Sequence, residues 1–350
     1  MTTYSLSTYM TALELARQLD PKGALVPLIQ SLSIQIPIFA DVHMEECNDG
    51  SGHIGTTEYY QPTGSWRAFN EGIAAEVPIT ADFREPTAMI NSRFQADRAM
   101  LIAKAQGDLA KAAILRSRML GQFTAGMFKT ISTALLYGTR VDGKSPKGIT
   151  TRSDYNALSS DYVHDNAGGA ASATANKTSL LLIGHGPQKY HWIYPAGIAP
   201  PSGTLSQPGK AITGFGIRND PLPDDLVKDV GATNEFLAVR NWMTANVGHC
   251  IEDARYVQRI VNISTSNIDG VDDFSFDENV AIDAVENMPD LQNAVWYCNK
   301  TMRAQIRKRH NDKGNVYYTP AEPNAPEVLT LCGLPVHVWE SIVNTEAKVS

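Results

Sequence analysis

Apolar and polar residues alternate near the start of the chain. In residues 32–38, leucine or isoleucine occupies every second position, which is the period of a strand. Pro37 has no backbone N–H to donate, so we predict an edge strand or an arm that lies on another surface. Before it, residues 9–19 have helical spacing and predict a short amphipathic helix that ends at Asp20 and Pro21.

Residues 50–72 are predicted to form a hairpin. His53–Tyr60 is expected to be the first strand, residues 61–64 a turn with proline and glycine, and residues 65–69 the returning strand. Both strands are largely polar, so little of this hairpin can be core. A lone hairpin is marginally stable in water. The hairpin therefore needs a neighbour, and a neighbouring subunit would serve.

Residues 93–137 have the strongest helical pattern in the chain. Apolar side chains recur there at steps of three and four, with Arg116 as the only break. One continuous helix of this size would be about 60 Å long, and three glycines are expected to weaken or bend it. The predicted apolar stripe consists of Leu101, Ala105, Leu109, Ala112, Met119, Phe123, Met127, Ile131 and Ala134.

The region from residue 150 to residue 330 mixes short strands and helices, so the predicted fold class is α+β. Alternating aromatic residues from Tyr190 to Tyr194 are typical of a half-buried strand. The expected elements are strands at Leu180–Ile183, Tyr190–Tyr194, Val328–Leu331 and Leu334–Trp339, a helix at 279–287 after a capping box at Ser275–Glu278, and a basic helix at Lys300–His310.

Composition and charge are those of an ordinary globular protein. The chain has 350 residues, of which 43% are apolar and 19% charged, so it can bury a substantial core in two or three domains. Its net charge of −7 does not suggest a free nucleic-acid-binding domain, which is usually basic.

Residues 93–129 are locally basic inside this acidic protein. Seven basic residues and two acidic ones leave a local charge of +5. Such a surface could face DNA through phosphates, or it could be a solvated face whose charges pair with acidic patches on a neighbour, and both can hold. The candidate DNA-facing residues are Arg93, Arg98, Lys104, Lys111, Arg116 and Arg118.

The cysteines do not form a metal-binding pattern. Cys47, Cys250, Cys298 and Cys332 lie far apart, so we expect free, mostly buried thiols in a reducing compartment, with no structural zinc site and no cofactor. No secretory signal precedes Arg17, and no uncharged run is apolar enough to span a bilayer. We therefore expect a protein that is made and used in a cytoplasm.

Residues 138–145 match the P-loop pattern G-x-x-x-x-G-K-S, whose backbone N–H groups cradle phosphates. That site requires a buried strand before the motif and a helix after it. Here a long helix precedes the motif, and Pro146 and Gly148 follow. We therefore favour a helix C-cap with a polar turn, and a P-loop nucleotide hydrolase built on Lys144 remains the alternative from another class.

Two further patterns are weaker candidates for chemistry. His249 and Cys250 are neighbours in sequence, and neighbouring side chains rarely face each other, so a structural histidine and a buried thiol are the favoured interpretation. Residues 267–273 are acidic but lack the glycine and glutamate of a calcium loop. We expect no catalysis.

The order of these parts resembles the major capsid proteins of tailed phages with the Hong Kong 97-type shell fold, in the branch found in short-tailed phages. The likeness spans nearly the whole chain in order. The stretches that carry it are Thr63–Gly72, Ala134–Gly138, Pro146–Ile149, Gly184–Trp192, Trp242–Asn262, Gly333–Val336 and Asn344–Glu346.

The resemblance implies a virion protein that forms hexamers and pentamers of an icosahedral head around double-stranded DNA, with assembly in the host cytoplasm. Its extended loop would lie on the next subunit through Tyr59, Tyr60, Pro62, Gly64, Trp66 and Arg67. The implied parts are an N-terminal arm at 1–49, an extended β-hairpin loop at 50–90, a peripheral domain with the spine helix at 91–149 and closing strands at about 328–350, and a mixed α/β axial domain at 150–327.

Two departures from the family pattern change the expected partners. Some members cross-link through a lysine on the extended loop, whereas no lysine occurs between Lys22 and Lys104 here, so a non-covalent shell with a possible cement protein is expected. Only a short arm precedes the hairpin, so we expect a separate scaffolding protein, besides a portal. An encapsulin-like compartment shell on the same fold is the nearest alternative.

Overall fold

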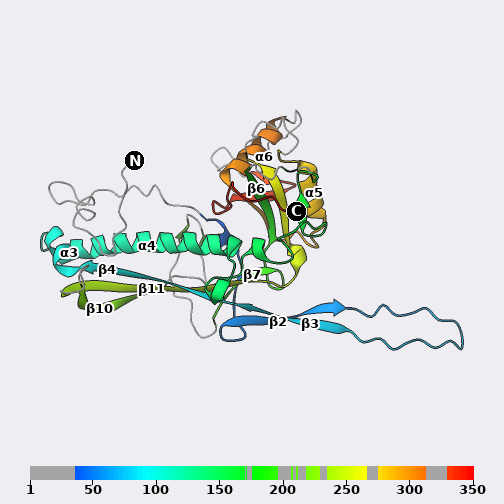
Figure 1. Ribbon diagram of the computed structural model, residues 1–350, viewed down its shortest axis with the longest axis horizontal. Helices are drawn as coiled ribbons and strands as arrows, with labels where there is room; N and C mark the ends of the chain where they lie inside the picture. The colour runs from blue at the N-terminus through cyan, green and yellow to red at the C-terminus, as the bar shows by residue number, and fades with distance from the viewer. Residues whose placement is uncertain are drawn as a thin grey trace.

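The computed structural model describes residues 36–169, 171, 176–195, 206–207, 210–211, 218–228, 235–265, 275–312 and 329–350. These residues form a long helix over one sheet, a second sheet with two helices, and a thin hairpin that projects away from both (Figure 1). The predicted fold class, α+β, is confirmed. The helix expected at 9–19 and the acidic loop at 267–273 lie outside the described residues.

The described helices are short except for one. They are α2 (Ile38–Asp41), α3 (Arg98–Lys104), α4 (Leu109–Tyr137), α5 (Glu278–Glu286) and α6 (Lys300–Asp312), with 3-10 turns at Val141–Gly143, Ile149–Thr151 and Ala254–Tyr256. The basic helix expected from Lys300 is therefore confirmed as α6. Ile38 was expected to end a strand and begins α2 instead, and residues 32–35 of that strand lie outside the described residues.

The strands fall into two larger sheets and two hairpins. They are β1 (Met44–Glu46), β2 (Gly52–Tyr60), β3 (Ile79–Pro86), β4 (Ala88–Asp97), β5 (Val163–Asp165), β6 (Lys177–Gly184), β7 (Tyr190–Tyr194), β8 (Ser206–Gln207), β9 (Lys210–Ala211), β10 (Arg218–Lys228), β11 (Glu235–Ile251), β12 (Val257–Ser264), β13 (Ala294–Cys298), β14 (Thr330–Leu331) and β15 (Leu334–Val338).

The first sheet is built around β11, which pairs with β10, β4 and β7. Helix α4 lies along this sheet (Figure 1). Phe94 of β4 packs edge-to-face on Phe123 of α4, with ring centroids 5.8 Å apart. Arg116, the break in the predicted apolar stripe, donates from Nε to Oδ1 of Asn241 on β11 at 2.8 Å. The helix thus contacts the sheet through a polar anchor as well as apolar side chains.

The single helix predicted at 93–137 is wrong at its start. Residues 93–97 belong to β4, and two helices follow. Asp97 accepts a hydrogen bond from the backbone of Ala99 and caps α3, and Asp108 caps α4 in the same way. Gly107 has φ +80° between them, which a continuous helix does not allow. Two aspartate caps therefore outweigh the apolar period here.

The buried side of α4 also differs from the predicted stripe. Met119, Met127 and Ile131 are buried as expected, whereas Leu109 and Phe123 are exposed. Helix α4 also buries residues that one stripe does not predict, most of them in its C-terminal half. These additional buried residues are Leu115, Phe128, Leu135 and Leu136.

The second sheet has the order β14-β15-β13-β6-β12-β5 and carries α5 and α6. The buried strand predicted at Leu180–Ile183 is confirmed within β6. The closing strands belong to this sheet, since β15 runs parallel to β13 with Val336 opposite Trp296. The sequence grouped residues 328–350 with the spine helix, and the residues after β15 do contact α4. Conversely, β10 and β11, assigned to the 150–327 domain, lie under α4.

The residues after β15 join the two parts of the molecule, and we call this contact region the junction. Trp339 donates from its indole nitrogen to Ser132 of α4 at 2.6 Å. Glu346 accepts from the hydroxyl of Tyr137 at 2.6 Å and from Arg259 of β12 at 3.0 Å. Arg259 and Glu346 are only 5% and 7% exposed, so this ion pair is buried between the helix and the second sheet.

Two smaller expectations are corrected. The cap of α5 is Asp277, which accepts from the backbone of Asn279, whereas Ser275 accepts from Arg309. Strand β7 is buried on both faces rather than half-buried, since its first four residues are all buried. Its alternating aromatic residues therefore do not mark a solvent-facing side.

Candidate subunit interface

The hairpin of β2 and β3 is the most exposed part of the described chain. The strands pair from Gly52 opposite Pro86 to Tyr60 opposite Ile79, and the arm extends well beyond the body (Figure 1). The first predicted strand is confirmed, but the turn at 61–64 and the returning strand at 65–69 are wrong. Residues 61–78 form a long connection instead, so the second strand begins only at Ile79.

Large apolar side chains are displayed along this arm. Trp66 and Phe69 are fully exposed in the long connection. Single exposed apolar residues are ordinary, but a run of them marks an interaction surface. The exposed apolar residues are Tyr59, Tyr60, Trp66, Phe69, Ile73, Val77 and Ile79. The other predicted interface residues, Pro62, Gly64 and Arg67, are exposed in the same connection.

The base of the arm is fixed to the body by a buried ion pair. Arg152 binds both carboxylate oxygens of Glu85 on β3 and also donates to the carbonyl of His249 at 3.2 Å. Phe83 lies across Gly55 on the opposite strand, where a Cβ would collide with its ring. The arm is therefore anchored at one end and unsupported at the other.

The predicted DNA-facing residues do not share one face of a helix. Arg93 lies on β4, next in sequence to Phe94, and its side chain points to the opposite face of the strand. Arg98 pairs with Asp224 at 3.0 Å, and Arg116 binds Asn241 beneath the helix. Lys104, Lys111 and Arg118 lie on α3 and α4 and are partly buried. The prediction from the sequence could not separate these groups, because it placed β4, α3 and α4 in one helix.

The P-loop pattern does not form a phosphate cradle. Gly138 is the C-cap of α4, and its own N–H donates to Ala134. The N–H groups of Gly143 and Lys144 donate to the carbonyls of Arg140 and Val141, at 3.3 and 3.2 Å. The next helical element after the motif is a 3-10 turn at Ile149–Thr151, and no α-helix begins there. The predicted C-cap and polar turn are confirmed.

His249 and Cys250 are structural. His249 donates from Nε2 to the carbonyl of Lys147, so its Nδ1 accepts from the hydroxyl of Tyr190 at 3.2 Å. Burial and the nearby Arg152 lower the pKa of His249 to about 3, which keeps the imidazole neutral. Burial also raises the pKa of the Cys250 thiol, so it is a poor nucleophile. The described cysteines are free, as expected.

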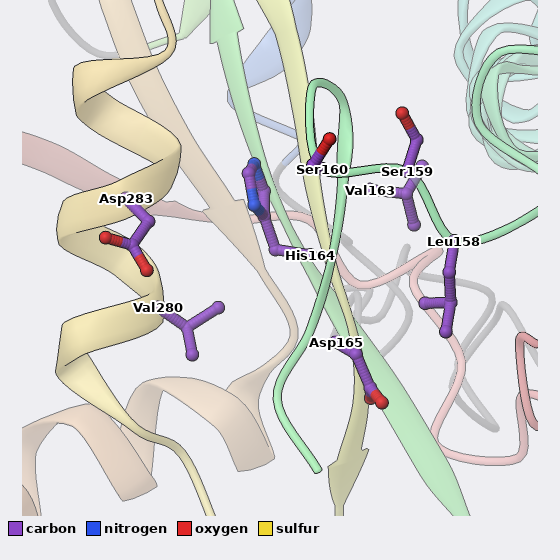
Figure 2. A pocket seen from close by; sticks show the side chains of 8 residues that line it. All are labelled: Leu158, Ser159, Ser160, Val163, His164, Asp165, Val280 and Asp283. Carbon is purple, nitrogen blue, oxygen red and sulfur yellow. The ribbon is translucent and has the colours of Figure 1, made fainter. Parts of the chain in front are cut away.

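A surface hollow between α5 and the segment before β5 is also built from structural groups (Figure 2). His164 hydrogen-bonds through Nε2 to Gln258 at 2.8 Å. Burial acts to raise the pKa of Asp165, but the hydrogen bonds from Asn262, Gly169 and Ala167 have the larger combined effect. The pKa of Asp165 is therefore lowered. His164 and Asp165 therefore hold the fold together.

An anchored arm with exposed aromatic side chains is typical of a subunit of a larger protein assembly. The family model described as major capsid protein GP7 matches residues 20–350, and the chain belongs to this family. It is a structural, shell-forming protein of a phage virion rather than an enzyme.

A solved structure shows the same fold. A chain of bacteriophage Epsilon15, from cryo-EM and modelling, is 24% identical, with 98% of each chain covered and a TM-score of 0.70. This likeness shows the shared fold, and the predicted Hong Kong 97-type capsid fold is confirmed. The bacteriophage JBD30 capsid matches at 7% identity over 79% and 84% of the two chains, with a TM-score of 0.44.

A more distant match is the holo-SrpI encapsulin complex from Synechococcus elongatus PCC 7942, at 10% identity over 72% and 95% of the two chains, with a TM-score of 0.41. No curated protein matches the chain. Among the described residues, no helix has the length and apolar character that a membrane span requires.

Proposed function

We propose that this capsid protein closes its shell by laying the β2–β3 arm across a neighbouring subunit of the same kind, in hexamers and pentamers. The exposed aromatic run on the arm carries the proposal. A single chain leaves those side chains in water, whereas burial of apolar area on a neighbour is favourable. Each contact is small, and many repeats around a closed shell supply the stability.

We propose that the arm contacts are non-covalent. The region from residue 23 to residue 103, which contains the whole arm, has no lysine to form an amide cross-link. Boiling purified shells in SDS should therefore release single chains. A ladder of oligomers that persists without a thiol bond would contradict this.

We propose that the shell encloses double-stranded DNA. The local charge of +5 over residues 93–129 supports an attraction to phosphates that requires no sequence contact. Lys104 and Lys111 are the candidates, because Arg98 and Arg116 already bind Asp224 and Asn241. Nuclease treatment of purified particles should leave protected DNA inside. A protein cargo in place of DNA would favour the encapsulin-like alternative.

We also propose roles for the two parts of the body. The part built on α4 and β11 would be the peripheral domain, and the six-stranded sheet with α5 and α6 would be the axial domain at the centre of the capsomer. A scaffolding protein, a portal and a possible cement protein are the proposed partners. Assembly would take place in the host cytoplasm.

The decisive experiment removes residues 62–66, a part of the long connection at the tip of the arm. The variant should keep its circular dichroism spectrum and fail to form closed shells in electron micrographs of the co-expressed proteins. Thr63→Ser, in the same segment, is the matched control and should assemble. Normal shells from the deletion variant would disprove the role of the tip, and unfolding of the variant would mean that the hairpin is core.

A further inference from the structure

Three side chains from distant parts of the sequence meet where the arm joins the body. His53 lies in β2 at the base of the arm, His191 in β7, and Glu252 just after β11. Their potential ligand atoms all lie within 4.8 Å of one another. Nε2 of His53 is 3.4 Å from Oε1 of Glu252, and Nε2 of His191 is 4.0 Å from the same oxygen.

The two imidazoles are buried with nitrogens that bind nothing in the described chain. The His191 side chain is 0% exposed, and neither of its ring nitrogens has a hydrogen-bond partner. The His53 side chain is 9% exposed, and its Nδ1 lacks a partner too. A buried polar atom without a partner costs about 1–3 kcal/mol. Nε2 of His191, 4.0 Å from Oε1 of Glu252, is thus a buried nitrogen whose partner a group bound at this cluster would supply.

We propose that His53, His191 and Glu252 form a divalent-cation site, best matched to Zn²⁺, at the base of the arm. Two imidazoles and a carboxylate are a donor set that zinc accepts, with a fourth position for water or another carboxylate. Neighbouring ligand atoms around tetrahedral zinc are about 3.3 Å apart, as its bond lengths require. The observed separations need only small side-chain movements to reach that value.

The surroundings suit a cation. Glu45 of β1 places a second carboxylate oxygen 3.8 Å from Nε2 of His191 and is the candidate fourth ligand. The Glu252 side chain is partly exposed, which gives an ion a path from solvent.

A cation here would cross-link three segments that backbone pairing joins only in part. It would tie the first residues of β2 to β7 and to the end of β11, beside the Glu85–Arg152 ion pair. The direction in which the arm leaves the body would then depend on the metal. The site is independent of where the tip binds, so metal binding and tip deletion can fail separately.

The test uses the purified full-length, unassembled protein, stripped with a chelator and titrated with Zn²⁺ by calorimetry. We expect one ion per chain, and Co²⁺ in its place should give the visible absorption of a tetrahedral site. Zn²⁺ should also slow hydrogen exchange in residues 52–54. No saturable binding, or binding without added protection of these residues, would overturn the proposal.

Variants distinguish this site from adventitious binding. Glu252→Gln and His53→Gln keep side-chain size and should each weaken Zn²⁺ binding at least tenfold. Glu46→Gln, the neighbour of Glu45 on the other face of β1, is the matched control and should bind as the parent does. Equal affinity in all four proteins would overturn the assignment, as would a loss in Glu46→Gln equal to that in Glu252→Gln.

Discussion

The arm and the junction differ in how far their side chains are exposed to solvent. The arm places tryptophan and phenylalanine in solvent, whereas the junction encloses Trp339 and the Arg259–Glu346 ion pair. A buried charge pair is tolerated only where neighbouring groups satisfy it, and here Tyr137 and Ser179 also bind Glu346. The polar groups of the junction find their partners within one chain, whereas the aromatic side chains of the arm remain exposed. We therefore expect stability to depend on the junction and assembly on the arm.

The largest effect on folding is expected from Glu346→Ala. It leaves the Arg259 charge buried without its partner, which typically costs about 3–5 kcal/mol. Urea unfolding of the unassembled protein measures the loss. Glu340→Ala is the matched control, because its partner Lys300 is exposed, and it should lose at most about 1 kcal/mol. Similar losses in both variants would show that the junction does not stabilise the fold.

Acid should weaken the body next. His249 has a folded pKa of about 3 against an ordinary value of 6.5, so between these values the unfolded chain binds more protons. Stability is therefore complete above pH 6.5 and falls below it, by about 1.4 kcal/mol per pH unit from this residue. Urea unfolding from pH 7 to pH 5 measures the slope. His249→Gln, which can still donate to Lys147, should reduce it, and an unchanged slope would contradict this.

Phe123→Asp should cost only about 1 kcal/mol. The side chain is 38% exposed, and its principal described contact is the edge-to-face pair with Phe94, which is worth about 0.5–1.5 kcal/mol. Leu115→Asp, at a fully buried position of the same helix, should cost several times more. Thermal unfolding compares the two, and a reversed order would mean that α4 packs through its other side.

The smallest effect on folding should come from the arm. Trp66→Ser with Phe69→Ser removes two fully exposed rings and should change the free energy of unfolding by less than about 0.5 kcal/mol. The same variant should lose assembly in sedimentation and electron microscopy, because those rings are proposed to be buried on a neighbour. Thr63→Ser serves as the control. A destabilised monomer would remove the contrast between arm and junction.

Local chemistry in the sequence predicted several elements well. The first arm strand and the basic helix α6 follow from period and composition, and the P-loop pattern was rejected because a helix precedes Gly138. Prediction failed where two local signals compete. Asp97 and Asp108 cap two helices inside an apolar period that continues across them.

The sequence alone determined the class of protein, because the order of arm, long helix and mixed region is a property of the chain. Tertiary structure decided which residues meet. His53, His191 and Glu252 lie far apart in the sequence, and the spacing of residues along the chain predicted no metal site. Glu346 and Arg259 are likewise far apart in the sequence, and their ion pair could not be predicted from spacing. Period and caps act between near neighbours along the chain, whereas ligand sets and buried ion pairs depend on which strands the sheets place side by side.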